Sequence, residues 1–315
     1  MMAINRRYDF VLLFDVVDGN PNGDPDAGNQ PRMDPDTGQG LVTDVSLKRK
    51  VRNYVEIACG DQPGFQIYVQ ERAVLNEKHR QAYLHVRPQD ASASTDKILI
   101  PKDDAEANIL RSFMCANFYD VRTFGAVMST GINCGQVRGP VQISFGRSIE
   151  PIMPLEITIT RSASTNKRSR DKLSSENGNW TDNKTMGRKY IIPYALYRVH
   201  GFVSASLAAK TGFSKGDLDL LWQAISGMFD HDRSASRGEM SARRLIIFEH
   251  ASVLGQASSH ELFDCVLVSR NNRSAGLQLP QKEEENFAPA RRFSDYSVEI
   301  AWDRIPSGVT VVLAL

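Results

Sequence analysis

The sequence lacks several features that would define a class of protein at once. No stretch approaches about 18 consecutive apolar residues, so neither a transmembrane helix nor a membrane partner is predicted. The basic N-terminus has no apolar segment behind it that resembles a signal peptide. The four cysteines are scattered without a CxxC pair, which disfavours a disulfide framework or a cysteine zinc site. A reducing cytoplasm is therefore the expected location.

Motifs that bind nucleotides or metals are also missing. Neither GxxxxGK(S/T) nor GxGxxG occurs, so a phosphate-cradling nucleotide site is not predicted. The RNP1 pattern of RNA-recognition motifs is absent, which argues against stacking of bases on sheet aromatics. His79 and His85 are six positions apart and His231 stands beside Asp232, so we expect surface or capping histidines. No cofactor and no metal site are predicted.

A global surplus of basic charge is missing as well, but basic residues are concentrated locally. The net charge of the 315 residues is +1. Residues 161–190 hold eight Lys or Arg against three acids, and residues 47–54 hold four basic residues and no acid. Contacts with phosphate are local, because charges are screened beyond about 10 Å. These two segments are the candidates for binding a polyanion.

The first 60 residues predict a strand, a loop and a basic helix. Residues 8–17 are typical of a buried strand, and the Gly/Pro/Asp/Asn-rich segment 18–40 predicts a loop. A helix is expected over 44–59, capped by Thr43 or Asp44. Its apolar face is predicted to comprise Leu47, Val51, Tyr54, Val55 and Ala58. Its basic arc, beside that face, is predicted to comprise Lys48, Arg49 and Arg52.

The rest of the chain predicts an α+β protein. An amphipathic helix is expected near 104–119, polar loops over 87–97, and a second helix over 214–229 with the apolar stripe Leu218, Leu221, Trp222, Ile225 and Phe229. Strands are expected over 138–146, 194–205, 243–250, 262–269, 297–302 and 309–315. The main elements then run β-α-β-β-α-β, the ferredoxin-like order, with two large insertions. This fold binds single-stranded RNA in many proteins but also has unrelated functions.

The basic segment 161–190 has no apolar core of its own. It predicts a protruding arm or hairpin, with residues 157–160 and 189–192 as its two stems. A polar, Ser/Asn-rich segment is also typical of disorder, and we expect it to order when RNA and a neighbouring subunit are present.

Long blocks of the sequence are similar to a known family. FDVVDGNPNGDPDAGNQPRMDPDTGQGLVTDVSLKRKVRNYV (14–55) resembles the N-terminal signature of the backbone subunit of type I CRISPR Cascade complexes. The closest likeness is to the Csd/Csh-type protein of subtype I-C, within the RAMP superfamily. Later blocks occur in the same order as in that family, at 124–128, 139–152, 186–197 and 229–250.

The resemblance implies an RRM-like (ferredoxin-like) palm with a thumb hairpin and a finger or web region. Five segments follow from it: the first segment of the palm (1–60), the inserted finger/web region (61–137), a palm strand (138–154), the basic thumb insertion (155–191) and the last segment of the palm, with C-terminal strands (192–315).

The resemblance also implies a function without catalysis. Several copies would assemble head to tail along one CRISPR guide RNA, together with other Cascade subunits. The protein would hold the RNA by its backbone, and the exposed bases would pair with target DNA, a division of labour known in other RNA-guided effectors.

Carried over by position, the resemblance implies a set of RNA-binding residues. The helix would contribute Lys48, Arg49 and Arg52, and the turn over 227–240 would contribute Arg233 and Arg237. The thumb would contribute Arg168, Arg170, Lys184, Arg188 and Lys189, with Met186 as a wedge between nucleotides.

Other functions compete for the loop that follows the first strand. Asp18, Asn20, Asn22 and Gly23 match half of an EF-hand, but Asn29 replaces the required Glu and a strand leads in. Turn geometry explains these residues more simply, and a functional account is that the loop lies near RNA or the adjacent subunit. The carboxylates Asp24, Asp26, Asp34 and Asp36 suggest a metal-dependent endoribonuclease of the same superfamily. A protein scaffold that binds no RNA is the other alternative.

Overall fold

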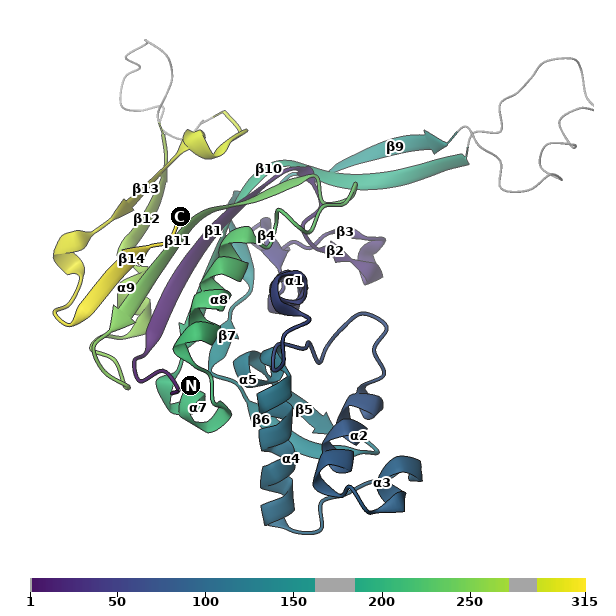
Figure 1. The fold of residues 1–315 in the computed structure, drawn as a ribbon. Coiled ribbons are helices and arrows are strands. Elements are labelled where there is room, and N and C mark those ends of the chain that lie inside the picture. Colours follow the sequence, from purple (N-terminus) through teal and green to yellow (C-terminus); the bar gives the residue numbers. More distant parts are fainter. Residues whose placement is uncertain (1, 162–184, 272–287) are drawn as a thin grey trace, which may run out of the picture.

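The computed structural model describes residues 2–161, 185–271 and 288–315, and it shows a mixed α+β protein with a large antiparallel sheet (Figure 1). The path through the eight-stranded sheet runs β14-β11-β1-β10-β8-β4, and β7 and β9 also pair with β10. The strands of this sheet are β1 (Tyr8–Gly19), β4 (Gln39–Val42), β7 (Val141–Ile143), β8 (Gly146–Pro151), β9 (Leu155–Arg161), β10 (Thr185–Val203), β11 (Glu239–His250) and β14 (Val309–Leu313).

Strand β1 lies in the middle of the sheet and is buried on both faces. It pairs with β10 on one side and with β11 on the other. Phe10 and Phe14 belong to one hydrophobic core, and Val11 and Leu13 belong to another. A strand covered on both faces needs a nearly continuous apolar sequence, which explains residues 8–17. The predicted strand is confirmed, with two further residues at its end.

Three helices cover one face of the sheet: α1 (Asp44–Cys59), α7 (Ala205–Thr211) and α8 (Lys215–Gly227). Both long helices were predicted, and the caps agree. Thr43 accepts a hydrogen bond from the backbone N–H of Ser46, and Ser214 forms a capping box with Asp217. Each cap contributes about 1 kcal/mol to helix stability. The predicted stripe on α8 packs in the core.

Two details of α1 differ from the predicted faces. Leu47, Val51 and Val55 are buried as expected, but Ala58 at the end of the stripe is exposed. Lys50, which was assigned to neither the predicted apolar face nor the predicted basic arc, is only 2% exposed. A lysine can be buried in this way when a carboxylate is buried beside it.

The opposite face of the sheet carries a second core beneath α9 (Ser259–Phe263) and the hairpin β12 (Val266–Arg270) and β13 (Tyr296–Ile300). Short 3-10 turns, Phe293–Asp295 and Trp302–Arg304, flank β13. The tail strands are therefore confirmed, except that residues 259–263 begin that region as a helix. Among the helices that the structure describes, none is long and apolar enough to span a membrane.

Residues between α1 and β7 form a group with its own core, away from the main sheet (Figure 1). Tyr83, Leu110 and Met114 are fully buried there. The group contains α2 (Leu75–Val86), α3 (Ala91–Thr95), α4 (Asp104–Asn117), α5 (Tyr119–Phe124), β5 (Gly125–Ser129) and β6 (Asn133–Arg138). The helix near 104–119 is thus confirmed.

Two predictions in this group were wrong. The polar segment 87–97 contains the helix α3, which Asp90 caps by accepting from the Ser92 N–H. His79 is not a surface histidine but is fully buried, with its ring stacked on Tyr68 and bonded to the Tyr68 hydroxyl at 2.7 Å. His85 and His231 are exposed, as expected.

Strands β9 and β10 leave the sheet together as a two-stranded arm (Figure 1). Both predicted stems lie in this pair of strands, but the register is shifted: residues 157–160 pair with 186–189 rather than with 189–192. β10 has 19 residues and runs without interruption from the arm through the sheet. The segment between the stems, 162–184, lies outside the described residues.

The predicted strand over 138–146 is divided in the structure. β6 ends at Arg138, β7 starts at Val141, and β8 starts at Gly146. Pro140 has no N–H to donate, which interrupts the ladder. At Ser144 the side-chain oxygen, rather than a backbone carbonyl, accepts from the His200 N–H.

The segment 18–40 is also more regular than predicted. It contains the two-residue strands β2 (Gly23–Asp24) and β3 (Gln30–Pro31), a 3-10 turn (Pro25–Ala27) and the start of β4. Short pairings of this kind leave no periodic pattern in the sequence.

Candidate nucleic-acid interface

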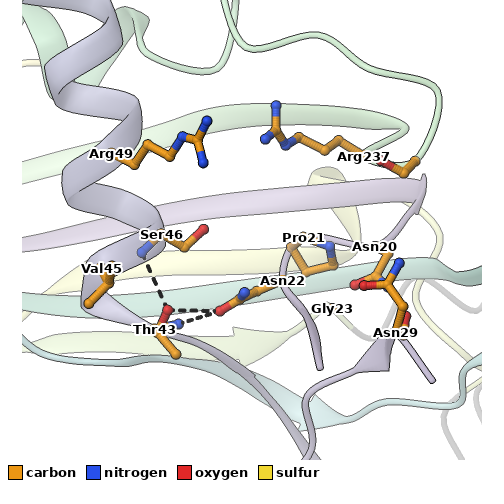
Figure 2. Close-up of a pocket in the computed structure, with 11 residues that line it drawn as sticks. Asn20, Pro21, Asn22, Gly23, Asn29, Thr43, Val45, Ser46, Arg49 and Arg237 are labelled. Atoms are coloured by element: carbon orange, nitrogen blue, oxygen red, sulfur yellow. Dashed lines mark hydrogen bonds between the residues drawn. The ribbon is translucent and has the colours of Figure 1, made fainter. Parts of the chain in front are cut away.

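A hollow of about 340 Å³ lies where the N-terminus of α1 meets the end of β1 (Figure 2). Its walls come from three segments that are distant in sequence. The lining residues are Asn20, Pro21, Asn22, Gly23, Asn29, Thr43, Val45, Ser46, Arg49, Ser236 and Arg237. Two of them are arginines and none is an acid, so the hollow is suited to an anion.

Two glycines bring the turn after α8 against the end of β1. A Cβ on Gly19 would lie 1.9 Å from the carbonyl oxygen of Arg237. Gly238 has φ +60°, and a Cβ there would lie 2.3 Å from the Val17 carbonyl oxygen. Only glycine permits both approaches. They allow the Asn20 N–H to donate to the Ser236 carbonyl at 2.8 Å, which holds Arg237 beside the hollow.

Asn22 ties the loop after β1 to the start of α1. Its Oδ1 accepts from the backbone N–H and from the hydroxyl of Thr43, both at 2.9 Å. Val45 and Ser46, in the first turn of α1, then line the hollow. The first turn of a helix presents free N–H groups and the positive end of the helix dipole, which together favour phosphate.

The two arginines extend toward each other across the hollow (Figure 2). Arg49 also pairs with Glu71 at 3.1 Å, but the two side chains are 58% and 71% exposed. An ion pair this exposed contributes little, so an anionic ligand can displace it at small cost.

Arg237 is fixed from behind by a buried carboxylate. Asp232 forms ion pairs with both Arg237 and Lys50. Burial lowers the pKa of the Lys50 ammonium, and the hydrogen bond to Asp232 opposes that shift. Removing Asp232 would leave the buried Lys50 ammonium without its carboxylate and Arg237 without its anchor, so this acid fixes the geometry of the site.

Arg49 is the one predicted α1 cation that lines the hollow. Lys48 pairs with Asp44, four positions earlier, at 2.8 Å. Arg52 pairs at 2.7 Å with Asp120, whose side chain is 1% exposed and also accepts from the Tyr68 N–H. Lys48 and Arg52 therefore have partners within the chain, and no sequence pattern indicates the one that lies 68 positions away.

The remaining predicted residues are spread over the arm and the turn after α8. Met186 is 73% exposed near the start of β10, and Arg188 pairs with Glu156 at 3.1 Å. Lys189 donates to the Ala235 carbonyl, which links the arm to the turn that carries Arg237. Arg233 pairs with Asp230 at 3.2 Å on the surface. Arg168, Arg170 and Lys184 lie outside the described residues.

Several lining residues were not foreseen as a site. Asn20 and Asn22 were explained by turn geometry, and Ser46 and Ser236 were not singled out. A usable signal was the two asparagines at alternate positions directly after a buried strand, where side chains lie at the strand end.

The carboxylates of the loop that follows β1 have partners within the chain. Asp24 pairs with Arg32 at 3.5 Å and accepts from the Asp26 N–H. Asp34 accepts from the Asp36 N–H and pairs with Arg147, and this hydrogen bond from Arg147 lowers its pKa. In the described part of the chain, no three Asp, Glu, His or Cys residues come together as metal ligands.

Comparison with known proteins gives the class. The family model for CRISPR-associated protein Cas7 matches residues 6–301. The chain therefore belongs to the Cas7 family. A curated relative, CRISPR-associated protein Cas7 from Haloferax volcanii, is 29% identical over 251 residues. The aligned part covers 71% of this chain and 65% of that relative, which is less than two thirds of its length.

Two solved structures overlap with the chain at low sequence identity. A chain of a CRISPR RNA-guided surveillance complex, pre-nicking, has a TM-score of 0.49 at 15% identity and covers 77% of this chain and 78% of its own. A chain of a second CRISPR RNA-guided surveillance complex has a TM-score of 0.44 at 14% identity, with coverages of 77% and 68%. Overlaps of this size do not define the topology of the sheet.

Proposed function

We propose that this chain is a non-catalytic, guide-RNA-binding backbone subunit of a type I-C Cascade complex. Several copies assemble head to tail along one CRISPR RNA in the cytoplasm, alongside other Cascade subunits, and the exposed bases pair with target DNA. The observation that carries the proposal is the acid-free hollow at the N-terminus of α1, with Arg49 and Arg237 on opposite sides. Such a site binds phosphate without reading a base.

The proposal includes an RRM-like palm. Part of the sheet runs β11-β1-β10-β8, and every neighbouring pair is antiparallel. With α1 after β1 and α8 after β10, this arrangement supports the split β-α-β pattern of ferredoxin-like folds. The group from α2 to β6 would be the finger or web region, because it has its own core.

The arm formed by β9 and β10 is our proposed thumb. One strand of it, β9, is exposed along its whole length, including Leu155, Ile157 and Ile159. A two-stranded ribbon with an apolar face is marginally stable alone. Contact with the next copy in the assembly would cover this face. Lys189, Arg188 and Met186 on the other strand would then lie near the RNA.

The first experiment is purification with and without a co-expressed CRISPR array. The measurements are the 260/280 nm absorbance ratio, the particle mass and the sequence of any bound nucleic acid. We expect repeat-spacer RNA in a particle with several copies of the chain, and no cleavage of that RNA after Mg²⁺ is added.

Two results would contradict the proposal. A nucleic-acid-free monomer in both preparations would favour a protein scaffold. Cleavage of RNA that requires Mg²⁺ and is lost in Asp34→Asn would favour the endoribonuclease alternative.

A further inference from the structure

Asn20 lines the hollow, and its buried side-chain oxygen has no hydrogen-bond partner among the described residues. The residue is 7% exposed, and its Nδ2 donates to the Asn29 backbone carbonyl at 2.8 Å. Among the described residues, no donor reaches its Oδ1. The Asn29 carbonyl oxygen can only accept a hydrogen bond, so the Asn20 amide atom that contacts it must be the nitrogen, Nδ2. Oδ1 is therefore the free end.

A buried acceptor without a donor has a cost in free energy, which a bound ligand can remove. A fitting ligand would carry an anionic group for the α1 N-terminus and the two arginines. It would also carry a hydrogen-bond donor for Asn20, close to the anionic group. A ribonucleotide has both, because its 2′-hydroxyl lies on the sugar next to the phosphate. A deoxyribonucleotide has only the phosphate.

We infer that Asn20 Oδ1 accepts a hydrogen bond from a ribose 2′-hydroxyl while a neighbouring phosphate occupies the space between Arg49 and Arg237. The hollow thereby selects RNA over DNA of the same sequence. This inference rests on the proposed function, since it names the chemistry by which the same site distinguishes guide RNA from DNA.

Base amino groups are the other donors in a nucleic acid, but they differ from one base to the next. The 2′-hydroxyl is present on every nucleotide of RNA. In a protein that holds guides of any sequence, only the sugar hydroxyl could donate a hydrogen bond to Asn20 with every guide. The arginines do not discriminate, because RNA and DNA carry the same phosphate charge.

The test uses the full chain and three oligonucleotides of one mixed sequence: RNA, 2′-fluoro RNA and DNA. Fluorine keeps the sugar pucker of RNA but cannot donate a hydrogen bond. We expect RNA to bind about tenfold more tightly than 2′-fluoro RNA, the effect of one hydrogen bond to a buried acceptor. This comparison needs no substitution in the protein.

Two variants locate the effect. In Asn20→Ala the ratio of the RNA and 2′-fluoro RNA affinities should fall to about one, because the acceptor is gone. Asn117→Ala, on α4, removes an asparagine whose Nδ2 also donates to a backbone carbonyl, that of Phe113 at 2.8 Å, but which does not line the hollow. The ratio should stay about tenfold in this control. Thermal unfolding checks that both variants fold.

The outcomes separate the inference from the proposed function. Equal binding of RNA and 2′-fluoro RNA by the unaltered chain would overturn the inference and leave guide binding intact. A preference that changes with base sequence would overturn it too, because Asn20 would then be reading bases. Failure to bind any oligonucleotide would contradict the proposed function itself.

Discussion

Arg49 and Arg52 lie three positions apart on α1 but have different surroundings. Arg52 is paired with the buried carboxylate of Asp120, and its guanidinium also lies 5.4 Å from the centre of the Phe124 ring. Arg49 has one exposed acidic partner and lines the hollow. We therefore expect the same residue type to serve stability at one position and ligand binding at the other.

Replacement of Arg52 should affect folding more than binding. In Arg52→Gln the Asp120 carboxylate stays buried without its cation, so the free energy of unfolding should fall by about 3 kcal/mol. Urea unfolding measures this loss. RNA affinity of the folded fraction should stay within about twofold of the unaltered chain. A large loss of affinity with normal stability would show that Arg52 contacts RNA directly.

Replacement of Arg49 should have the opposite profile. Arg49→Gln should weaken RNA binding and reduce the slope of log affinity against log salt by about 0.7, the value for one phosphate contact on a single strand. Stability should change by less than about 0.5 kcal/mol, because the pair with Glu71 is exposed.

Lys215→Gln is the matched control for Arg49→Gln. Lys215 also sits on a helix with one exposed acidic partner, Asp219, at 2.7 Å, but it begins α8, whereas the turn that lines the hollow follows the other end of that helix. Its replacement should leave the salt slope unchanged. Equal slopes of log affinity against log salt for the unaltered chain and Arg49→Gln would show that Arg49 does not contact a phosphate.

His200 should make stability depend on mildly acidic pH. Its Nε2 accepts from the Arg198 Nε–H at 2.9 Å, and its ring stacks on Phe263. Burial, with the nearby Arg198 charge, lowers the pKa of His200 to about 4. Between the ordinary pKa of about 6.5 and this value the unfolded chain binds a proton that the folded chain does not. Stability is therefore lost as the pH falls through that window.

The measurement is the urea midpoint at pH 7.5 and pH 5 for the unaltered chain and for His200→Gln. The glutamine retains an acceptor for Arg198 but does not titrate. The variant should lose less stability between the two pH values. An identical loss in both proteins would mean that His200 titrates normally.

At the scale of elements, both ends of helix α1 were predicted to the residue, because the signals for its ends are local. The cap at Thr43, the acid at Asp44 and the apolar spacing all lie within the helix itself. The division of the segment 138–146 was only partly predictable: Pro140 is a local signal for the first break, but the second break, between β7 and β8, depends on Ser144 meeting His200 in another strand. Strand breaks of this kind are decided by tertiary contacts.

The candidate site, too, could be predicted only in part from the sequence. The basic residues on α1 were visible in the sequence. The sequence did not show that Lys48 and Arg52 form ion pairs with acidic residues of the same chain. The buried pair of Lys50 and Asp232 spans 182 positions. The position of Asn20 directly after a buried strand was a local signal, but the distant turn that encloses it was not visible in the sequence.

At the scale of the whole molecule, the arm should govern assembly rather than binding by one copy. Replacing Ile157 and Ile159 with threonine keeps two β-branched residues in β9 but removes exposed apolar surface. The double variant should bind a short RNA normally and form particles with fewer copies on a long guide. Mass photometry measures the number of copies, and short-RNA affinity is the control. If the double variant forms particles with as many copies as the unaltered chain, the proposed contact is contradicted.

β10 belongs to both the sheet and the arm, and this continuity has a mechanical consequence. Its 19 residues span about 60 Å at the usual rise per residue. The residues that pair with β1 extend to Ile192, and those that pair with β9 start at the adjacent Ile191. Because one strand belongs to both, the position of the sheet fixes the position of the base of the arm. Inserting one residue near Ile192 would turn every arm side chain beyond it to the opposite face, whereas inserting two would preserve the faces and lengthen the reach by about 7 Å.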